Sequence, residues 1–517
     1  MLPFRSVRSR LLPLGVLAGA IACSLLLQRT LADQVFWSGD SGLKALMTQQ
    51  FAAGELHADL RLPAEPWVRE LWEKGLYPFD PPFVYEIEGR HYIQYPLVFP
   101  LLSALPYRLF GWRGLYVIPL LSTWLLWGAF LVVCARWGWG ATETAAALAS
   151  LALASPLTFY SATYWEHAPA VALAFVGLVP LLTPAWRTGR AGLLLHGVAF
   201  GLALWLREEL FALLGGLLGL ALLAKATGRA AWFPRERSGP WFAGALAAAL
   251  ALLGANEWVY GHPLGAHAFA VLRYPEFSRL GNALVLWRVL PGLLVTGFPI
   301  ALVACIAPFL RRAEPTTPSA EPLRFLLLLC ALVVAAIPAL LPDVRLGGTG
   351  GKQWGPRFLL GVVPLLCLLA GQVVREARLS TARPLRAGLV AAFLLAFAAS
   401  LRVNLLQAAA VLSQDYALRV LPSLSFLRTD PSSSVAVTHQ FIAQEMMPAL
   451  KQKRFFLIRN PAQIALLADA LDARGEREFL YVSEGAVPQP AITASGRVVH
   501  VVPIAAYEPY SIARVSW

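Results

Sequence analysis

Charged residues are scarce in this chain of 517 residues, where Asp, Glu, Lys and Arg make up only 14%. A soluble globular protein carries about 25% charged residues. Hydrophobic residues reach 57%, and the mean hydropathy is +0.59. The shortage of charge excludes an ordinary soluble globular protein and indicates a membrane protein with many spans.

Metal-binding and nucleotide-binding motifs are also missing. The five cysteines lie within or beside apolar runs, with no CxxC pair, so neither a disulfide framework nor a zinc site is indicated. No DxD pair occurs. A tightly bound metal is therefore not supported. No cofactor is predicted, although a divalent cation is compatible with the sequence. The C-terminal segment from about residue 430 has no Gly-rich phosphate loop, which argues against a nucleotide site there.

The net charge of +13 comes from basic residues scattered over short segments between apolar runs. A basic stripe with interleaved aromatics, as nucleic-acid binding requires, is absent. Basic residues in short loops are typical of the cytoplasmic side of membrane proteins. The lipid bilayer is therefore an expected partner and nucleic acid is not. The excess of Arg over Lys and the abundance of Ala and Leu are typical of a GC-rich bacterium, which predicts the bacterial cytoplasmic membrane.

About eleven apolar stretches approach the roughly 20 residues that a helix needs to cross a bilayer. They cover 11–28, 113–134, 142–160, 168–184, 191–206, 209–224, 240–258, 284–310, 323–342, 358–374 and 386–408. We interpret 11–28 as a retained span rather than a signal peptide. The Pro-rich stretch 96–110 predicts an interfacial or re-entrant helix, because an extra span there would reverse every later orientation.

The basic residues orient these spans. With the N-terminus in the cytoplasm, Arg136, Arg311 and Arg386 all fall in inward segments, as the positive-inside rule requires. The loop 29–95, the "GGKQWGPR" stretch at 350–357 and everything after about residue 410 then lie outside. The positive-inside rule does not explain basic residues in these outward segments, so their presence requires another reason.

The outward loop 29–95 contains a candidate base. Asp40, in "SGDSG" at 38–42, precedes a helix predicted from Ser41 and can cap it. The same carboxylate at the membrane surface can also accept a proton. Further on, two alternating stretches around Glu88 and Gly89 predict a β-hairpin.

Two later outward turns carry ionisable residues. Glu166 and His167 lie in "YWEH" at 164–167. A charged group at membrane depth is costly and indicates a functional site by default, with a plain polar loop as the alternative. In "LREE" at 206–209, Arg207 can either pair with one of the two following carboxylates, Glu208 or Glu209, or face a cavity.

The stretch "GGKQWGPRFLL" at 350–360 places Lys352 and Arg357 at the mouth of a span. A bound anion explains two fixed cations on the outward side, although Arg357 can also simply reach the interface. Trp354, between them, can stack on a sugar or anchor the loop.

The C-terminal segment changes in composition. Strands are predicted in 434–440, 454–460 and 479–485, with helices over 441–452 and 461–474. This alternation favours a small α/β domain outside the membrane. The expected fold is therefore mainly α, with a helical membrane domain over 1–410 and an extracytoplasmic α/β domain over 411–517.

Five motifs in this order resemble the GT-C superfamily of integral-membrane glycosyltransferases, which includes protein O-mannosyltransferases and the aminoarabinose lipid A transferase. They are "SGDSG" (38–42), "YPLVFPLLSALPYRLFG" (95–111), "YWEH" (164–167), "LREE" (206–209) and "GGKQWGPRFLL" (350–360). The resemblance covers 1–410 and implies transfer of a sugar from a polyprenyl-phosphate carrier to a lipid, glycan or protein acceptor on the outer face of the membrane.

The resemblance implies roles for particular residues. Asp40 stands where the family has its acidic residue, but Ser41 follows it where family members often have a second acid. Transfer with inversion requires a positioned base, and the leaving phosphate requires cations rather than a proton. The implied assignments are Asp40, Glu166 and His167 for catalysis, Arg357, Lys352 and Arg207 for the donor phosphate, and Trp354, Tyr95 and Glu208 for shaping the substrate site.

Alternative functions remain compatible with the sequence. A transporter or flippase would place polar residues along the middle of its helices. An O-antigen ligase or polymerase also uses outward arginines, but has its large functional loop late in the chain. A non-catalytic assembly protein would use the C-terminal domain to bind partners.

Overall fold

The computed structural model describes residues 8–183, 188–228, 235–266, 279–310, 320–341, 354–485, 496 and 498–517. Over these residues the chain is mainly helical, as expected. Its contacts divide it into two compact units. Unit 1 comprises Met1–Thr30 and Tyr116–Leu412, and unit 2 comprises Leu31–Leu115 and Ser413–Trp517. The first long loop therefore packs with the C-terminal segment, a grouping that crosses the domain division expected at residue 410.

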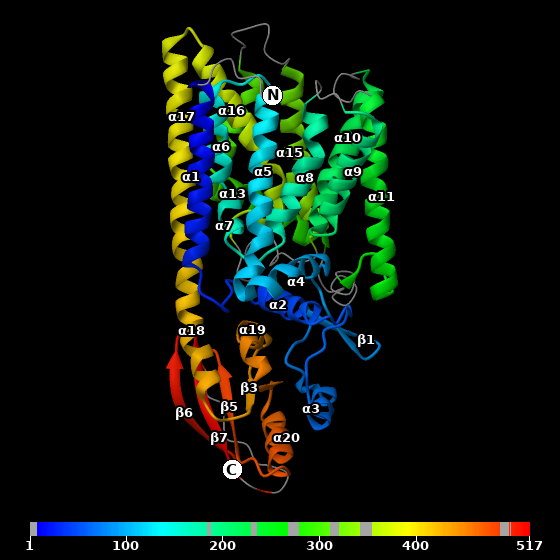
Figure 1. Ribbon diagram of the computed structural model, residues 1–517, viewed down its shortest axis with the longest axis vertical. Helices are drawn as coiled ribbons and strands as arrows, with labels where there is room; N and C mark the ends of the chain where they lie inside the picture. The colour runs from blue at the N-terminus through cyan, green and yellow to red at the C-terminus, as the bar shows by residue number, and fades with distance from the viewer. Residues whose placement is uncertain are drawn as a thin grey trace. The chain divides into compact units, whose positions relative to one another are not determined.

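Unit 1 is a bundle of apolar helices (Figure 1). Its helices are α1 (Arg8–Thr30), α5 (Val117–Arg136), α6 (Ala141–Ala152), α7 (Leu157–Ser161), α8 (His167–Leu182), α9 (Arg190–Leu204), α10 (Phe211–Ala226), α11 (Arg235–Tyr260), α13 (Arg279–Gly297), α14 (Ile300–Ile306), α15 (Ala320–Leu340), α16 (Val363–Leu379) and α17 (Arg383–Leu401). Short 3-10 helices η3 (Glu208–Leu210), η5 (Ala307–Phe309) and η7 (Arg357–Val362) and the π-helix η8 (Arg402–Leu412) connect or extend them.

Eight helical segments of the described residues are long and apolar enough to cross a membrane, and three apolar helices are shorter. The chain is thus a multi-pass membrane protein, whereas the count of about eleven spans stays a prediction. Two expected spans are interrupted. The stretch 142–160 breaks before α7, at Pro156, and 284–310 breaks at Pro299 between α13 and α14. Proline breaks a helix because it lacks the amide donor and its ring clashes with the preceding turn.

Glycines allow α8, α9 and α11 to pack closely. A Cβ on Gly177 would lie 2.6 Å from Cβ of Phe200, and one on Gly197 would lie 2.0 Å from the backbone oxygen of Trp241. Trp241 Nε1 donates to the backbone oxygen of Gly177 at 2.7 Å. Small residues at helix interfaces are the usual means of close packing in membranes.

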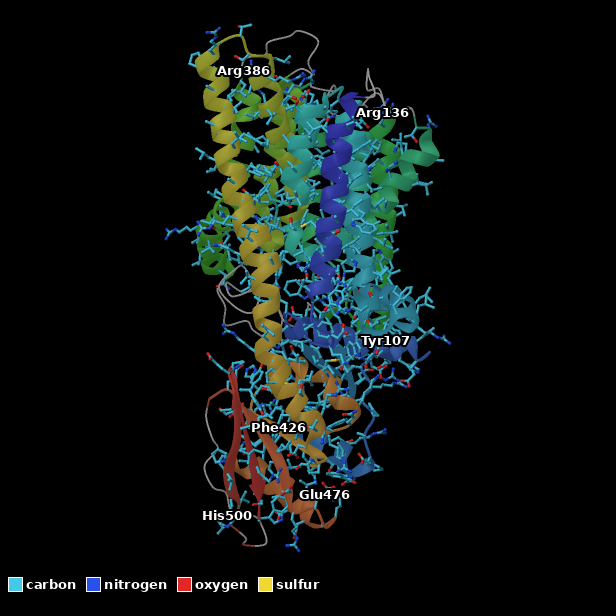
Figure 2. The ribbon with its side chains drawn as sticks, turned by 60° about the vertical axis from the view of Figure 1, so that its left-hand side comes forward. Tyr107, Arg136, Arg386, Phe426, Glu476 and His500 are labelled. Atoms are coloured by element: carbon cyan, nitrogen blue, oxygen red, sulfur yellow. The ribbon has the colours of Figure 1, made fainter. Side chains whose placement is uncertain are left out.

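The helix ends of unit 1 that carry basic residues lie together. Arg136, in the last turn of α5, and Arg386, in the first turns of α17, are at the same end of the bundle (Figure 2). Because α16 ends at Leu379, just before α17 begins, Arg357 and the start of α16 lie at the opposite end. This separation is the one that the positive-inside pattern predicted.

Unit 2 contains a short helical region and a mixed sheet. The helical region consists of α2 (Gly39–Ala52), α3 (Pro66–Leu71), η1 (Trp72–Leu76), α4 (Val98–Phe110) and η2 (Gly111–Tyr116), with the hairpin β1 (Val84–Ile87) and β2 (Arg90–Ile93). The C-terminal segment contains α18 (Ser413–Thr429), β3 (Ser434–Val437), α19 (Gln440–Glu445), η9 (Met447–Lys451), β4 (Arg454–Leu457), α20 (Pro461–Asp472), β5 (Glu478–Ser483), β6 (His500–Tyr507) and β7 (Tyr510–Ser516).

The expected hairpin is confirmed. Val84 pairs with Ile93 and Ile87 with Arg90, and the two turn residues, Glu88 and Gly89, have φ of 51° and 73°. Positive φ at both central residues is the geometry that matches the twist of a two-residue hairpin.

The expected C-terminal α/β domain is confirmed and extended. The sheet order is β4-β3-β5-β7-β6, with β4, β3 and β5 parallel and the last two strands antiparallel. β6 and β7 were not predicted. Pro503 inside β6 weakens the strand pattern, and such a proline is tolerated because β6 is the edge of the sheet.

The first long loop and the C-terminal segment share one core. Val68, Leu71 and Leu76 from the loop pack with Phe456 and Leu467 from the C-terminal segment, all of them buried. Trp72 Nε1 adds a hydrogen bond to the backbone oxygen of Phe455 at 3.1 Å. Neither segment forms this core alone.

The expectation that Asp40 caps a helix is wrong. Helix α2 begins at Gly39, its N-cap residue is Ser38, and Asp40 lies within the first turn. Helix α4 covers most of the stretch 96–110 and packs on α2 within unit 2. It ends at Gly111, whose φ of 59° separates it from α5. Its Leu105 and Leu109 are 64% exposed, and an interfacial position for α4 stays a prediction.

Candidate functional site

Glu166 and His167 lie at the start of α8 and are buried, with exposures of 0% and 2%. The ring of Tyr160, on α7, stacks on that of Trp165 at 5.5 Å and on that of His167 at 4.6 Å. This aromatic stack fixes the turn in front of α8. The two expected site residues are therefore held in a rigid and water-poor environment.

Arg207 connects two carboxylates between α9 and α10. Its Nη1 donates to Oε1 of Glu166 at 3.0 Å, and its Nε donates to Oε1 of Glu209 at 2.8 Å. Burial opposes the charge on Arg207, but Glu209 and Glu166 outweigh it and raise the pKa of the guanidinium. The structural ion pair anticipated for Arg207 is thus present, with Glu166 and Glu209 as its partners. Glu208 lies beside it, at the start of η3.

Arg357 lies in the same region of unit 1. Its Cζ is 4.7 Å from the ring centroid of Phe358 and 5.7 Å from that of Trp165. The Cζ of Arg207 is 5.7 Å from the same Phe358 ring. Gly355, with φ of 55°, permits the turn that leads into η7. Glu166, His167, Arg207 and Arg357 are therefore brought together from three parts of the sequence.

Trp354 is held by two hydrogen bonds. Its backbone oxygen accepts from Tyr160 Oη at 2.7 Å, and its Nε1 donates to Oδ1 of Asn404 at 3.1 Å. The amide nitrogen of Asn404 donates to the backbone oxygens of Ala154 and Gly297, at 3.0 and 2.8 Å. Sequence reasoning missed Asn404, although a lone Asn within the apolar stretch 386–408 is a signal.

Asn404 is expected to stabilise unit 1. Replacing Asn404 by Leu should lower the free energy of unfolding by about 3 kcal/mol, because buried carbonyl groups would lose their donors. Thermal unfolding in detergent, followed by tryptophan fluorescence, measures the loss. The matched control is Asn256→Leu, since the Asn256 amide donates to Pro263 near the protein surface. Equal melting of both variants would contradict the expectation.

Unit 2 contains Asp40 and a lysine that sequence reasoning missed. Lys44 follows Asp40 by one helical turn on α2 and is only 1% exposed. Its Nζ lies 4.4 Å from the ring centroid of Tyr95, which is itself buried. Thr48, one turn further, donates to the backbone oxygen of Pro100 and attaches α2 to α4. The spacing of four residues between Asp40 and Lys44 was the available signal, because it places both on one helix face.

Several expectations are not tested by this geometry. Lys352, one of the expected phosphate ligands, lies outside the described residues. Asp40 and Tyr95 belong to unit 2, and the remaining site residues belong to unit 1. Among the described residues, no group of three His, Cys, Asp or Glu side chains could hold a metal ion.

Similar solved structures identify the fold. No protein-family model matches the chain, and no curated protein matches its sequence. ArnT from Cupriavidus metallidurans bound to undecaprenyl phosphate matches with a TM-score of 0.55 and 13% identity, over 97% of this chain and 98% of that one. Its apo state matches with a TM-score of 0.53 and 14% identity over the same shares. The arabinofuranosyltransferase AftD from Mycobacteria gives a TM-score of 0.47 and 17% identity, over 97% of this chain and 40% of that one.

The chain has the fold of ArnT, an aminoarabinose lipid A transferase of the GT-C superfamily. The resemblance inferred from the five sequence motifs is thereby confirmed as a matter of fold. Fold alone does not determine chemistry, so the activity depends on the site residues.

Proposed function

We propose that this protein is a membrane glycosyltransferase that moves a sugar from a polyprenyl-phosphate carrier to an acceptor hydroxyl. The observation that carries the proposal is the placement of Asp40 and Lys44 on successive turns of α2. A carboxylate can accept the hydroxyl proton, and a neighbouring cation can stabilise the leaving phosphate. The ArnT structure bound to undecaprenyl phosphate supports this class of carrier.

The reaction would proceed as a single displacement with inversion. Asp40 takes the proton of the acceptor hydroxyl while the oxygen of that hydroxyl bonds to the anomeric carbon of the sugar. The bond between that carbon and the phosphate oxygen breaks, and its electron pair stays on the phosphate. The phosphate leaves as an anion, so it requires positive charge and not a second acid. Lys44 supplies this charge in unit 2.

The residues of unit 1 receive supporting roles in the proposal. Glu166 and His167 orient the sugar or the acceptor, and Trp354 packs against the sugar. Arg357, next to Phe358 and Trp165, remains a proposed phosphate ligand because a guanidinium binds two phosphate oxygens at once. The two carboxylates beside Arg207 favour a role in holding Glu166 over direct phosphate binding.

The proposed setting is the bacterial cytoplasmic membrane. Arg136 and Arg386 lie at one end of unit 1 (Figure 2). The positive-inside rule assigns that end to the cytoplasm in this proposal. The chemistry then takes place on the outer face. A transporter is less well supported, because the buried ion pairs of Arg207 lie between the ends of α9 and α10 and not along the middle of a helix.

Lys44→Met tests the phosphate role. The variant should lower transfer from a polyprenyl-phosphate sugar about 10²- to 10³-fold, the usual loss when one group that stabilises developing charge is removed. The assay is transfer of radiolabelled sugar in proteoliposomes, run with a panel of polyprenyl-phosphate donors. Lys74→Met, at an exposed lysine of the same loop, is the control. Equal turnover of both variants would remove Lys44 from the site.

A further inference from the structure

We propose that the C-terminal α/β segment positions Asp40, through the packing of α19 at Gln444 against the two glycines on either side of Asp40. This inference rests on the proposed function of Asp40 as the base. It gives the C-terminal segment a role that sequence reasoning left open. Both helices belong to unit 2, in which α19 packs directly on α2 (Figure 1).

The contact is made at the helical turn that carries Asp40. A Cβ on Gly39 would lie 2.3 Å from Oε1 of Gln444 and 3.0 Å from its Cβ. A Cβ on Gly42 would lie 2.0 Å from the backbone oxygen of Gln444. The glycines on either side of Asp40 thus allow α19 to press against the backbone of this turn. A larger residue at Gly42 would have to move one of the two helices, and a larger residue at Gly39 would have to displace the buried Gln444 side chain.

Helix α19 is itself held in place by hydrogen bonds to other parts of unit 2. Gln444 is 0% exposed, and its Nε2 donates to Oε1 of Gln440 at 3.3 Å. Gln440 in turn accepts from the backbone nitrogen of Asp80 at 3.1 Å. Tyr510, on β7, donates to Glu445, next to Gln444. Burial and the Glu445 carboxylate raise the pKa of Tyr510, so it stays a hydrogen-bond donor.

These contacts connect the sheet to the proposed base. Tyr510 of β7 hydrogen-bonds to Glu445, and Asp80 hydrogen-bonds to Gln440, so both ends of α19 are attached to other segments. Helix α19 in turn packs against the first turn of α2. A general base acts only when its oxygen lies within hydrogen-bond reach of the proton it takes. A displacement of 1 Å at a reacting group can cost about 10²-fold in rate. The C-terminal segment therefore affects catalysis through the orientation of Asp40.

The test is a double-mutant cycle between Gly39 and Gln444. Gly39→Ala should lower kcat at least tenfold, because the added Cβ meets Gln444 and displaces the first turn of α2, which carries Asp40. Adding Gln444→Ala removes Oε1 and should restore a large part of kcat, since the two changes are coupled through direct contact. Gly128→Ala is the control, because a Cβ there meets nothing within 4 Å.

Hydrogen exchange provides a readout that does not depend on activity. The amides of residues 39–44 should exchange faster in Gly39→Ala than in wild type, and more slowly again in the double variant. Either wild-type kcat or unchanged exchange in Gly39→Ala would overturn the inference, and so would a failure of Gln444→Ala to restore either quantity.

The two proposals fail in different ways. Full activity of Asp40→Asn would show that the proposed function of Asp40 is wrong. Exchange then decides the inference alone: faster exchange at 39–44 in Gly39→Ala supports a positioned turn, and unchanged exchange overturns it. Loss of activity in Asp40→Asn with normal kcat in Gly39→Ala would keep the function and reject the positioning role.

Discussion

Replacing Asp40 by Asn is expected to lower the rate of sugar transfer about 10²- to 10⁴-fold, the usual contribution of a general base. The amide has nearly the shape of the carboxylate but cannot accept the acceptor's proton. Because Asp40 lies in the first turn of α2 without capping it, the substitution should leave the helix in place. The effect should therefore appear in kcat, with little change in melting temperature.

The measurement is single-turnover transfer from a polyprenyl-phosphate sugar in proteoliposomes. Asp33→Asn is the matched control, since Asp33 lies in the same loop and pairs with Arg113 at 2.7 Å, with both side chains about half exposed. That variant should stay within about twofold of wild type, as an exposed ion pair contributes little. Turnover of Asp40→Asn equal to that of Asp33→Asn would rule out Asp40 as the base.

Replacing Arg207 by Leu is expected to lower the free energy of unfolding of unit 1 by about 3–5 kcal/mol. The variant leaves the Glu166 carboxylate, which is 0% exposed, without the guanidinium that donates to it at 3.0 Å. A buried carboxylate that loses its ion-pair partner is far more costly than one at the surface. Unfolding by denaturant in detergent, followed by tryptophan fluorescence, measures the change.

A second substitution separates this effect from simple loss of packing. Adding Glu166→Gln to Arg207→Leu should recover part of the stability, because a neutral amide costs less to bury than a carboxylate. Arg113→Leu is the surface control and should cost less than about 1 kcal/mol. A double variant that is no more stable than Arg207→Leu would contradict the ion-pair explanation.

Local patterns in the sequence predicted local structure well. The turn at Glu88 and Gly89 and the strands beginning near Ser434, Arg454 and Glu478 are all found. Each depends on neighbouring residues alone, such as a positive φ in a tight turn or a short run of β-branched and aromatic residues. β6 was missed because Pro503 disturbs its pattern, and only pairing with β7 makes it a strand.

The candidate site was predicted in part. Glu166, His167, Arg207 and Arg357 stood out because charges at membrane depth require a reason. Lys44 and Asn404 did not stand out, although both are buried polar groups within the structure. Each looks ordinary in its own stretch of sequence, and its importance comes from Tyr95 in one case and from Trp354 in the other.

The sequence by itself determined the environment of this protein, because scarce charge and long apolar runs leave a lipid bilayer as the only solvent that suits them. It also determined the hairpin, most strands and the end of unit 1 at which ionisable residues collect. Only the tertiary structure decided that 31–115 and 413–517 form one unit, and that Gln444 lies against the turn of Asp40. Such contacts depend on shape complementarity between segments far apart in the chain. The residue pattern of either segment alone does not predict that complementarity.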